Sequence, residues 1–159
     1  MTQQPFTKSL VPWLVRHEGD WYGTYVHVDE TGKEVDRHVS HLIAEFPGGP
    51  DYHQTNRYKW ADGRVEEHLF PGSFDSESER ITFDTERIDG WARGLDERHV
   101  QLQFTYKGGS DHYVYEFVHL SDNERHRSRT WHWYDGDGRL YKRTLIAETR
   151  EPTDEHDGI

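Results

Sequence analysis

Apolar and polar residues alternate one by one along most of this chain. In residues 98–106, for example, Val100, Leu102, Phe104 and Tyr106 alternate with polar neighbours. A period of two is that of a β-strand, whose successive side chains point to opposite faces of a sheet. Runs of this kind predict strands at 20–28, 35–46, 52–60, 64–70, 79–84, 87–93, 98–106, 111–120, 125–134 and 139–149.

Short turn sequences separate these runs. Asp62-Gly63 and Gly136 supply the positive φ angles that tight hairpin turns need. No helical run of 10–15 residues lies between the strands, which excludes parallel βαβ units. We therefore predict an all-β, up-and-down antiparallel barrel of about 8–10 strands, wide enough for one small ligand. A two-sheet sandwich is the alternative.

The ends of the chain differ from the strand region. A short N-terminal helix is predicted over residues 9–19, with Ser9 as N-cap, Pro12 in its first turn and Gly19 at its end. The length of 159 residues favours a single domain. We assign residues 1–150 to one barrel domain and residues 151–159 to a flexible polar tail.

Charge and composition limit the partners. Asp and Glu number 30 against 19 Lys and Arg, a net charge of −11, which argues against nucleic acid and against anionic membranes. There is no cysteine, so disulfides and Cys-ligated zinc are excluded. No run approaches the ~18 apolar residues of a membrane span, and the first residues lack the pattern of a signal peptide. We expect a cytoplasmic protein, and a homodimer is left open.

Several strands place polar or aromatic groups on the face that should point inward. In 52–60 the face of Gln54 also carries Tyr52 and Trp60, whereas the opposite face is polar and charged. Amides and phenols inside a barrel either orient a ligand or form a buried network that fixes strand register. The ligand-binding candidates from these faces are Tyr25, His27, Gln54, Asn56, Tyr58 and Phe104.

Glu116 interrupts an otherwise aliphatic face. It shares its side of the strand at 111–120 with Val114 and Val118, but the opposite side, with Tyr115 and Phe117, is nearly as apolar. The two orientations are equally supported. If Glu116 points inward, burial would raise its pKa or a partner would have to lie beside it.

The strand at 125–134 carries functional groups on both faces, and the sequence does not decide between them. One face has Arg127, Arg129, Trp131 and Trp133, and the other has Ser128, Thr130, His132 and Tyr134. If the first face points inward, it makes a pocket of cations and indoles. If the second face points inward, it makes an acid–base site centred on His132. Only a β-bulge could direct Arg129 and His132 to the same side.

Two segments resemble a known group of proteins. Residues 13–25 place a short helix before Gly19-Asp20-Trp21-Tyr22-Gly23, which is similar to the opening of calycin-like barrels, the lipocalin superfamily in the broad sense. Residues 129–133 and 138–143 resemble bacterial lipocalin-like domains of unknown function. The resemblance implies a barrel with an internal cavity. It implies no single reaction, because the group includes carriers, haem-binding nitrobindin-like barrels, decarboxylases and cyclases.

Four candidate functions follow. We lean towards a cofactor-independent lyase, isomerase or cyclase, with Glu116, His132, Tyr58 and Arg129 as catalytic acid, base, phenol and cation. The alternatives are a non-catalytic carrier of a small apolar or aromatic molecule, a haem barrel that uses His132, or a barrel filled by its own side chains. The histidine spacing favours no protein-bound metal, and we expect no cofactor. The remaining ligand-binding candidates are Trp131, Trp133 and Arg143.

Overall fold

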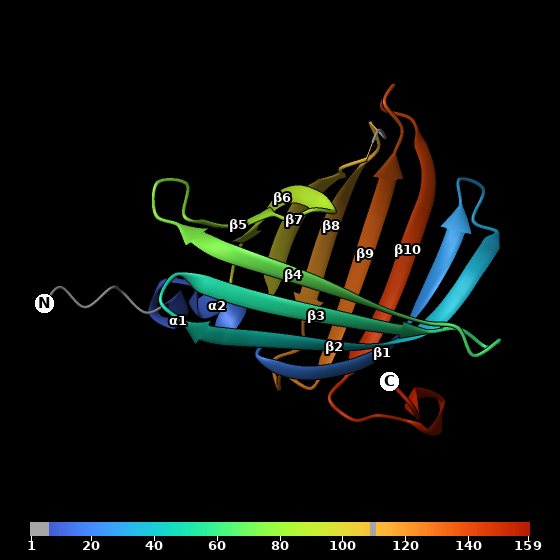
Figure 1. The fold of residues 1–159 in the computed structure, drawn as a ribbon, viewed down its shortest axis with the longest axis horizontal. Coiled ribbons are helices and arrows are strands. Elements are labelled where there is room, and N and C mark those ends of the chain that lie inside the picture. The colour runs from blue at the N-terminus through green and yellow to red at the C-terminus, as the bar shows by residue number, and fades with distance from the viewer. Residues whose placement is uncertain (1–6, 109–110) are drawn as a thin grey trace, which may run out of the picture.

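Ten antiparallel strands form a closed barrel in the computed structural model, which describes residues 7–108 and 111–159 (Figure 1). Each strand pairs with its neighbours in the sequence, and pairing of the first with the last closes the barrel. This confirms the predicted up-and-down barrel. The strands are β1 (Gly19–Asp29), β2 (Glu34–Gly48), β3 (Asp51–Lys59), β4 (Val65–Asp75), β5 (Arg80–Asp84), β6 (Ile88–Gly94), β7 (His99–Tyr106), β8 (Tyr113–Leu120), β9 (His126–Tyr134) and β10 (Leu140–Thr149).

Strand β4 is longer than predicted. It continues through Pro71, which pairs with His53 of β3, and then through Gly72. Pairing with β5 begins only at Gly72, so the missing N–H of Pro71 leaves no gap in that ladder. A Cβ atom at Gly72 would lie 2.8 Å from the side chains of Ile81 and Phe83, so a glycine lets β4 approach β5.

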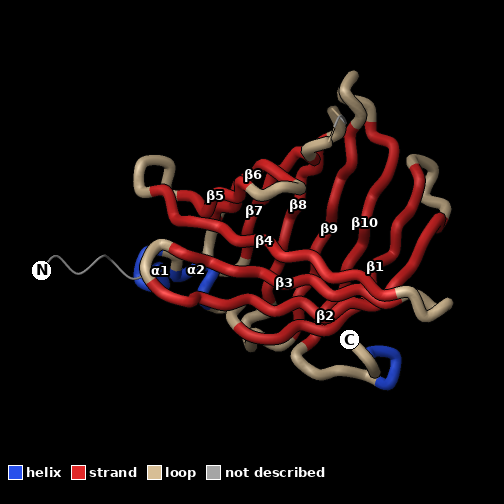
Figure 2. Tube along the Cα trace, in the orientation of Figure 1, coloured by secondary structure: helices blue, strands red, loops and turns tan. Residues whose placement is uncertain are grey.

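The N-terminal segment forms two short helices instead of the single predicted helix. They are α1 (Thr7–Leu10) and α2 (Pro12–Val15), at one end of the barrel (Figure 2). Pro12 begins α2 as expected, and its ring and missing N–H prevent α1 from continuing through it. Ser9 lies inside α1 rather than at its cap. Trp13 packs against Gly94 of β6, where an added Cβ would lie 2.3 Å from the indole.

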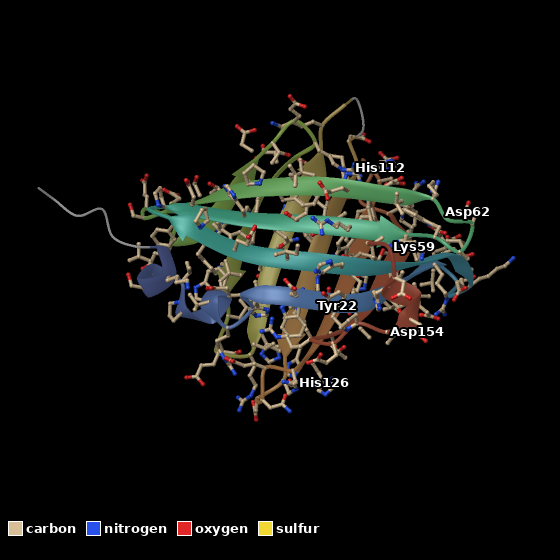
Figure 3. All side chains as sticks on the ribbon, turned by 60° about the horizontal axis from the view of Figure 1, so that its bottom comes forward. Tyr22, Lys59, Asp62, His112, His126 and Asp154 are labelled. Carbon is tan, nitrogen blue, oxygen red and sulfur yellow. The ribbon has the colours of Figure 1, made fainter. Side chains whose placement is uncertain are left out.

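The C-terminal segment was predicted to be a flexible tail, but part of it packs on the outer wall of the barrel. A 3-10 turn, η1 (Asp154–His156), lies on the same side of the molecule as Tyr22 and Lys59 (Figure 3). His156 is buried, and its Nε2 lies 3.1 Å from the carbonyl oxygen of Gly23. No helix in the described residues is long and apolar enough to cross a membrane.

Candidate functional site

The barrel encloses a cavity of about 280 Å³. It reaches the barrel end opposite to the helices, because Val35, Glu66 and Lys142, next to the turns at that end, contribute to its wall. Its deeper wall is mostly aromatic. The ring-bearing residues that line it are Tyr25, His27, His38, Tyr58, Trp60, His68, Phe70, Phe83, Trp91, Phe104, Tyr106, Trp131 and Trp133.

Strand β9 turns its arginine and tryptophan face inward. Arg127, Arg129, Trp131 and Trp133 are each less than 10% exposed, and the alternate residues lie on the outer wall. The orientation follows from the neighbouring strand, because Trp131 pairs directly with Glu116 of β8, whose aliphatic face also points inward. The pocket of cations and indoles is therefore the one that forms.

Arg129 and Glu116 form a buried ion pair at the floor of the cavity. Arg129 Nε donates to Glu116 Oε2 at 2.8 Å, and Trp131 Nε1 donates to the same oxygen. Arg129 Nη1 donates to the hydroxyl of Tyr25 at 2.9 Å and to Glu148 Oε2 at 3.3 Å. Burial alone would lower the pKa of Arg129, but the charges of Glu116 and Glu148 and the contact with Tyr25 raise it well above its ordinary value.

A second buried ion pair continues this network towards the helices. Arg127 Nε donates to Glu148 Oε1 at 2.7 Å, and Arg127 Nη1 lies 3.2 Å from His17 Nδ1. Burial would raise the pKa of Glu148, but Arg127 and Arg129 outweigh it and lower this pKa. Burial, followed by the charge of Arg127, lowers the pKa of His17 to about 2. Two arginines and two glutamates thus compensate one another inside the barrel, as buried charges must.

One face of β3 carries a ladder of polar side chains along the cavity wall. The hydroxyl of Tyr52 donates to Gln54 Oε1 at 3.1 Å, Gln54 Nε2 to Asn56 Oδ1 at 3.0 Å, and Asn56 Nδ2 to the oxygen of Tyr58 at 2.9 Å. Residues two apart share a strand face, which explains the regular spacing. Burial raises the pKa of Tyr58, and that of Tyr52 to about 12, so both phenols are neutral.

Two histidines meet near the mouth of the cavity. His27 Nε2 and His38 Nε2 lie 3.0 Å apart, and His27 Nδ1 lies 2.8 Å from the hydroxyl of Thr144. Burial, and then the charge of His38, lowers the pKa of His27 to about 4. Burial also lowers the pKa of His38. Both imidazoles are therefore neutral near pH 7, and one ring nitrogen of the pair can donate while the other accepts.

The sequence analysis missed His38 as a cavity residue. Counting back from the turn between β1 and β2 would place Arg37 opposite Tyr25, but a register shift between His27 and Val28 brings His38 there instead, so the sequence carried no signal for this contact. Among the described residues no group of three or more His, Cys, Asp or Glu could hold a metal ion.

Most predicted site residues line this cavity, and two do not. His132 and Arg143 lie on the outer wall, where they pair with each other across β9 and β10. The predictions that His132 serves as catalytic base or haem ligand, and that Arg143 contacts the ligand, are therefore wrong in position. The cause is the orientation of β9, since a strand cannot direct Arg129 and His132 to one side without a bulge. The candidates that do line the cavity are Glu116, Tyr58, Arg129, Tyr25, His27, Gln54, Asn56, Phe104, Trp131 and Trp133.

Comparison with known proteins identifies a matching family and solved structures of similar fold. The family described as "Domain of unknown function (DUF3598), N-terminal" matches residues 8–153. A crystal structure of a DUF3598 protein of unknown function from Nostoc punctiforme is 16% identical, with a TM-score of 0.69 over 87% of this chain and 49% of that one. The chain thus spans about half the length of that relative.

A second solved structure has the same fold at full length. The S-type phycobiliprotein lyase CPES from Guillardia theta is 10% identical, with a TM-score of 0.69 over 91% of this chain and 94% of that one. At these identities both likenesses concern the fold alone. No curated protein matches the sequence.

Proposed function

We propose that this chain, which belongs to the family of DUF3598 N-terminal domains, binds a small and largely aromatic molecule inside its barrel. The observation that carries the proposal is the cavity of about 280 Å³ with aromatic walls and a few convergent polar groups. Small-molecule sites have this composition, and the volume lies near the lower end of their usual range of about 300–1,000 Å³. The ligand should therefore have one or two rings rather than a large extended body.

The first experiment asks whether the cavity binds a simple aromatic molecule. Tryptophan fluorescence is titrated with 2-ethylnaphthalene, since Trp131 and Trp133 line the cavity and should report its occupation. Leu102→Trp places an indole in the cavity and should weaken binding by about tenfold or more. Gln101→Trp, on the outer face of the same strand, is the matched control and should bind as wild type does. Equal binding by both variants, or none by wild type up to the solubility limit of the probe, refutes the proposal.

Native mass spectrometry of freshly purified protein complements the titration. A retained molecule would appear as added mass, and an absorption spectrum would reveal haem directly. The sequence predicts neither a metal nor a cofactor, so a retained organic molecule is the expected result.

We propose acid–base chemistry on the bound molecule as a second function, as a lyase, isomerase or cyclase without a cofactor. The neutral pair of His27 and His38 favours it, because an uncharged imidazole can accept a proton near pH 7. His38 also packs 4.6 Å from the ring of Tyr58, between their centroids, so base and phenol face the same space. The catalytic set then comprises His38, Tyr58, Glu116 and Arg129.

The test for chemistry separates an enzyme from a carrier. Once the retained molecule is identified, its turnover is followed with wild type, His38→Gln and Glu116→Gln. An enzyme should lose turnover in both variants while each still binds the molecule. Unchanged turnover in His38→Gln would contradict a role of this imidazole as base. A molecule that is bound but never converted by wild type would support the carrier.

Self-association and location remain predictions of the sequence. The outer wall around β8 exposes Tyr115 and Phe117, and the outward residues of β7 to β10 include no Asp or Glu in a chain of net charge −11. Two copies would meet there with the least charge repulsion. Sedimentation velocity should show a dimer that Phe117→Glu abolishes and Leu69→Glu, at another exposed apolar position, does not. A monomer in wild type would refute it. A cytoplasmic location is expected from the sequence alone.

A further inference from the structure

The polar ladder of β3 has a fixed direction. An amide accepts through its oxygen and donates through its nitrogen, and Gln54 and Asn56 each use both ends within the ladder. The hydroxyl proton of Tyr52 is therefore used at the first step, towards Gln54. At the last step the oxygen of Tyr58 accepts from Asn56, so the ladder does not use the proton of Tyr58.

The hydroxyl of Tyr25, like that of Tyr58, accepts a hydrogen bond. Its oxygen accepts from Arg129 Nη1 at 2.9 Å, and a guanidinium can only donate, so this contact does not use the proton of Tyr25 either. The two phenol rings are in edge contact, with centroids 5.1 Å apart. Even a hydrogen bond between the two hydroxyls would use only one of their two protons. One phenolic proton of the pair is left for an acceptor in the cavity that both residues line.

Glu116 supplies the opposite group to the same cavity. Both hydrogen bonds to its carboxylate in the described residues, from Arg129 and from Trp131, end on Oε2. Oε1 takes part in neither of them, and Glu116 lines the cavity. The floor thus presents one phenolic donor and one carboxylate acceptor to a ligand.

We propose that the ligand of this cavity carries an oxo group, such as a carbonyl conjugated to its aromatic ring, which accepts the phenolic proton of the Tyr25–Tyr58 pair. The inference rests on the proposed binding function and names the class of ligand. The guanidinium of Arg129 polarises the hydroxyl of Tyr25, and such chains strengthen each successive hydrogen bond. A ligand without an acceptor would cover the phenolic proton and leave it unpaired, which costs affinity. An N–H or O–H beside the oxo group would pair with Oε1 of Glu116.

A pair of probes tests this class directly. 2-Acetonaphthone and 2-ethylnaphthalene have the same ring system and nearly the same shape, but only the former has a carbonyl oxygen. The dissociation constant of the ketone divided by that of 2-ethylnaphthalene, both measured by tryptophan fluorescence, cancels the contribution of the shared ring system. The double variant Tyr25→Phe/Tyr58→Phe should raise this ratio by about three- to tenfold, because only the ketone loses a hydrogen bond. Tyr52→Phe is the matched control, because the ladder already uses that proton, and it should leave the ratio unchanged.

A second measurement needs no variant, in case the double variant fails to fold. The infrared carbonyl stretch of 2-acetonaphthone bound to wild type should move to lower wavenumber than in hexane, as in a hydrogen-bonded ketone. The contrary result is that both probes bind while the carbonyl stretch of the bound ketone equals its value in hexane and the double variant leaves the ratio of dissociation constants unchanged. That result overturns the oxo assignment, although the binding function stands. If neither probe binds, the binding function itself fails.

Discussion

Glu148 holds two buried arginines, and its substitution by glutamine is the most direct test of the internal charge network. Its side chain is fully buried and accepts from Arg127 Nε at 2.7 Å and from Arg129 Nη1 at 3.3 Å. Glutamine keeps the shape of the side chain but removes the charge. Its amide oxygen can accept from one guanidinium, while its amino group must then face the other.

The expected loss follows from the burial of all three groups. The side chains of Arg127 and Arg129 are 6% and 4% exposed, so water cannot replace the lost carboxylate. Removing one partner of a buried ion pair costs about 3–5 kcal/mol because it leaves an uncompensated charge. For a domain of this size that corresponds to a fall in Tm of roughly 6–20 °C.

Urea denaturation followed by circular dichroism and tryptophan fluorescence measures the loss. Glu67→Gln is the control, since Glu67 pairs with Arg57 at 2.8 Å on the surface, and it should cost at most about 1 kcal/mol. The network lowers the folded-state pKa of Glu148 below its ordinary value of 4.5. Its contribution is therefore complete above that pH and is lost as the pH falls through the folded-state pKa, so wild type and Glu148→Gln should converge in acid.

A small effect would refute this account of the barrel interior. If Glu148→Gln loses less than about 1 kcal/mol at pH 7, the two arginines are not held by its charge. A double variant, Arg127→Met/Glu148→Met, distinguishes unpaired charge from poor packing. It should recover part of the loss, because apolar residues of similar volume can replace a buried ion pair.

Three further predictions concern other parts of the molecule. Gly94→Ala should destabilise the fold by about 1–3 kcal/mol in urea because its methyl group would displace Trp13, and an unchanged midpoint would show that the indole moves freely. Because the folded-state pKa of His27 is about 4, against 6.5 for the free side chain, wild-type stability should fall as the pH drops from 6.5 towards 4. Stability measured against pH should be flatter for His27→Asn, and identical profiles would contradict the depressed pKa. His132→Ala and Arg143→Ala should each change the affinity for 2-ethylnaphthalene by no more than about twofold, because both residues lie on the outer wall. A loss of affinity beyond about fivefold would show that the substituted residue contributes to the binding site.

The alternation of side chains predicted the strands because it is a local property. Each strand of a barrel has one face inside, so Tyr52, Gln54, Asn56 and Tyr58 could be assigned to one wall from their own segment. Ten such strands joined by short turns favoured a barrel over a two-sheet sandwich, and the structure shows that the barrel is closed. The helix at residues 9–19 was predicted less well, because Pro12 begins a second short helix instead of lying in the first turn of a single helix that starts at Ser9.

The packing of the final residues was not predicted, for a similar reason. Their polar composition gives no sign of the contact between His156 and the backbone of Gly23, which exists only once β1 is in place. The same holds for the meeting of His27 and His38, which depends on the register of β1 and β2.

By itself, the sequence determined a barrel with polar and aromatic groups in its interior, because a period of two residues specifies both the strand and its two faces. It could not determine which face of β9 is inside, because Arg129 and His132 stand on faces of similar polarity. Only the tertiary structure decided this. Arg129 can be buried because Glu116 of β8 and Glu148 of β10 lie on either side of it and compensate its charge. Those partners are 13 and 19 residues away in the chain, and no local pattern brings them together.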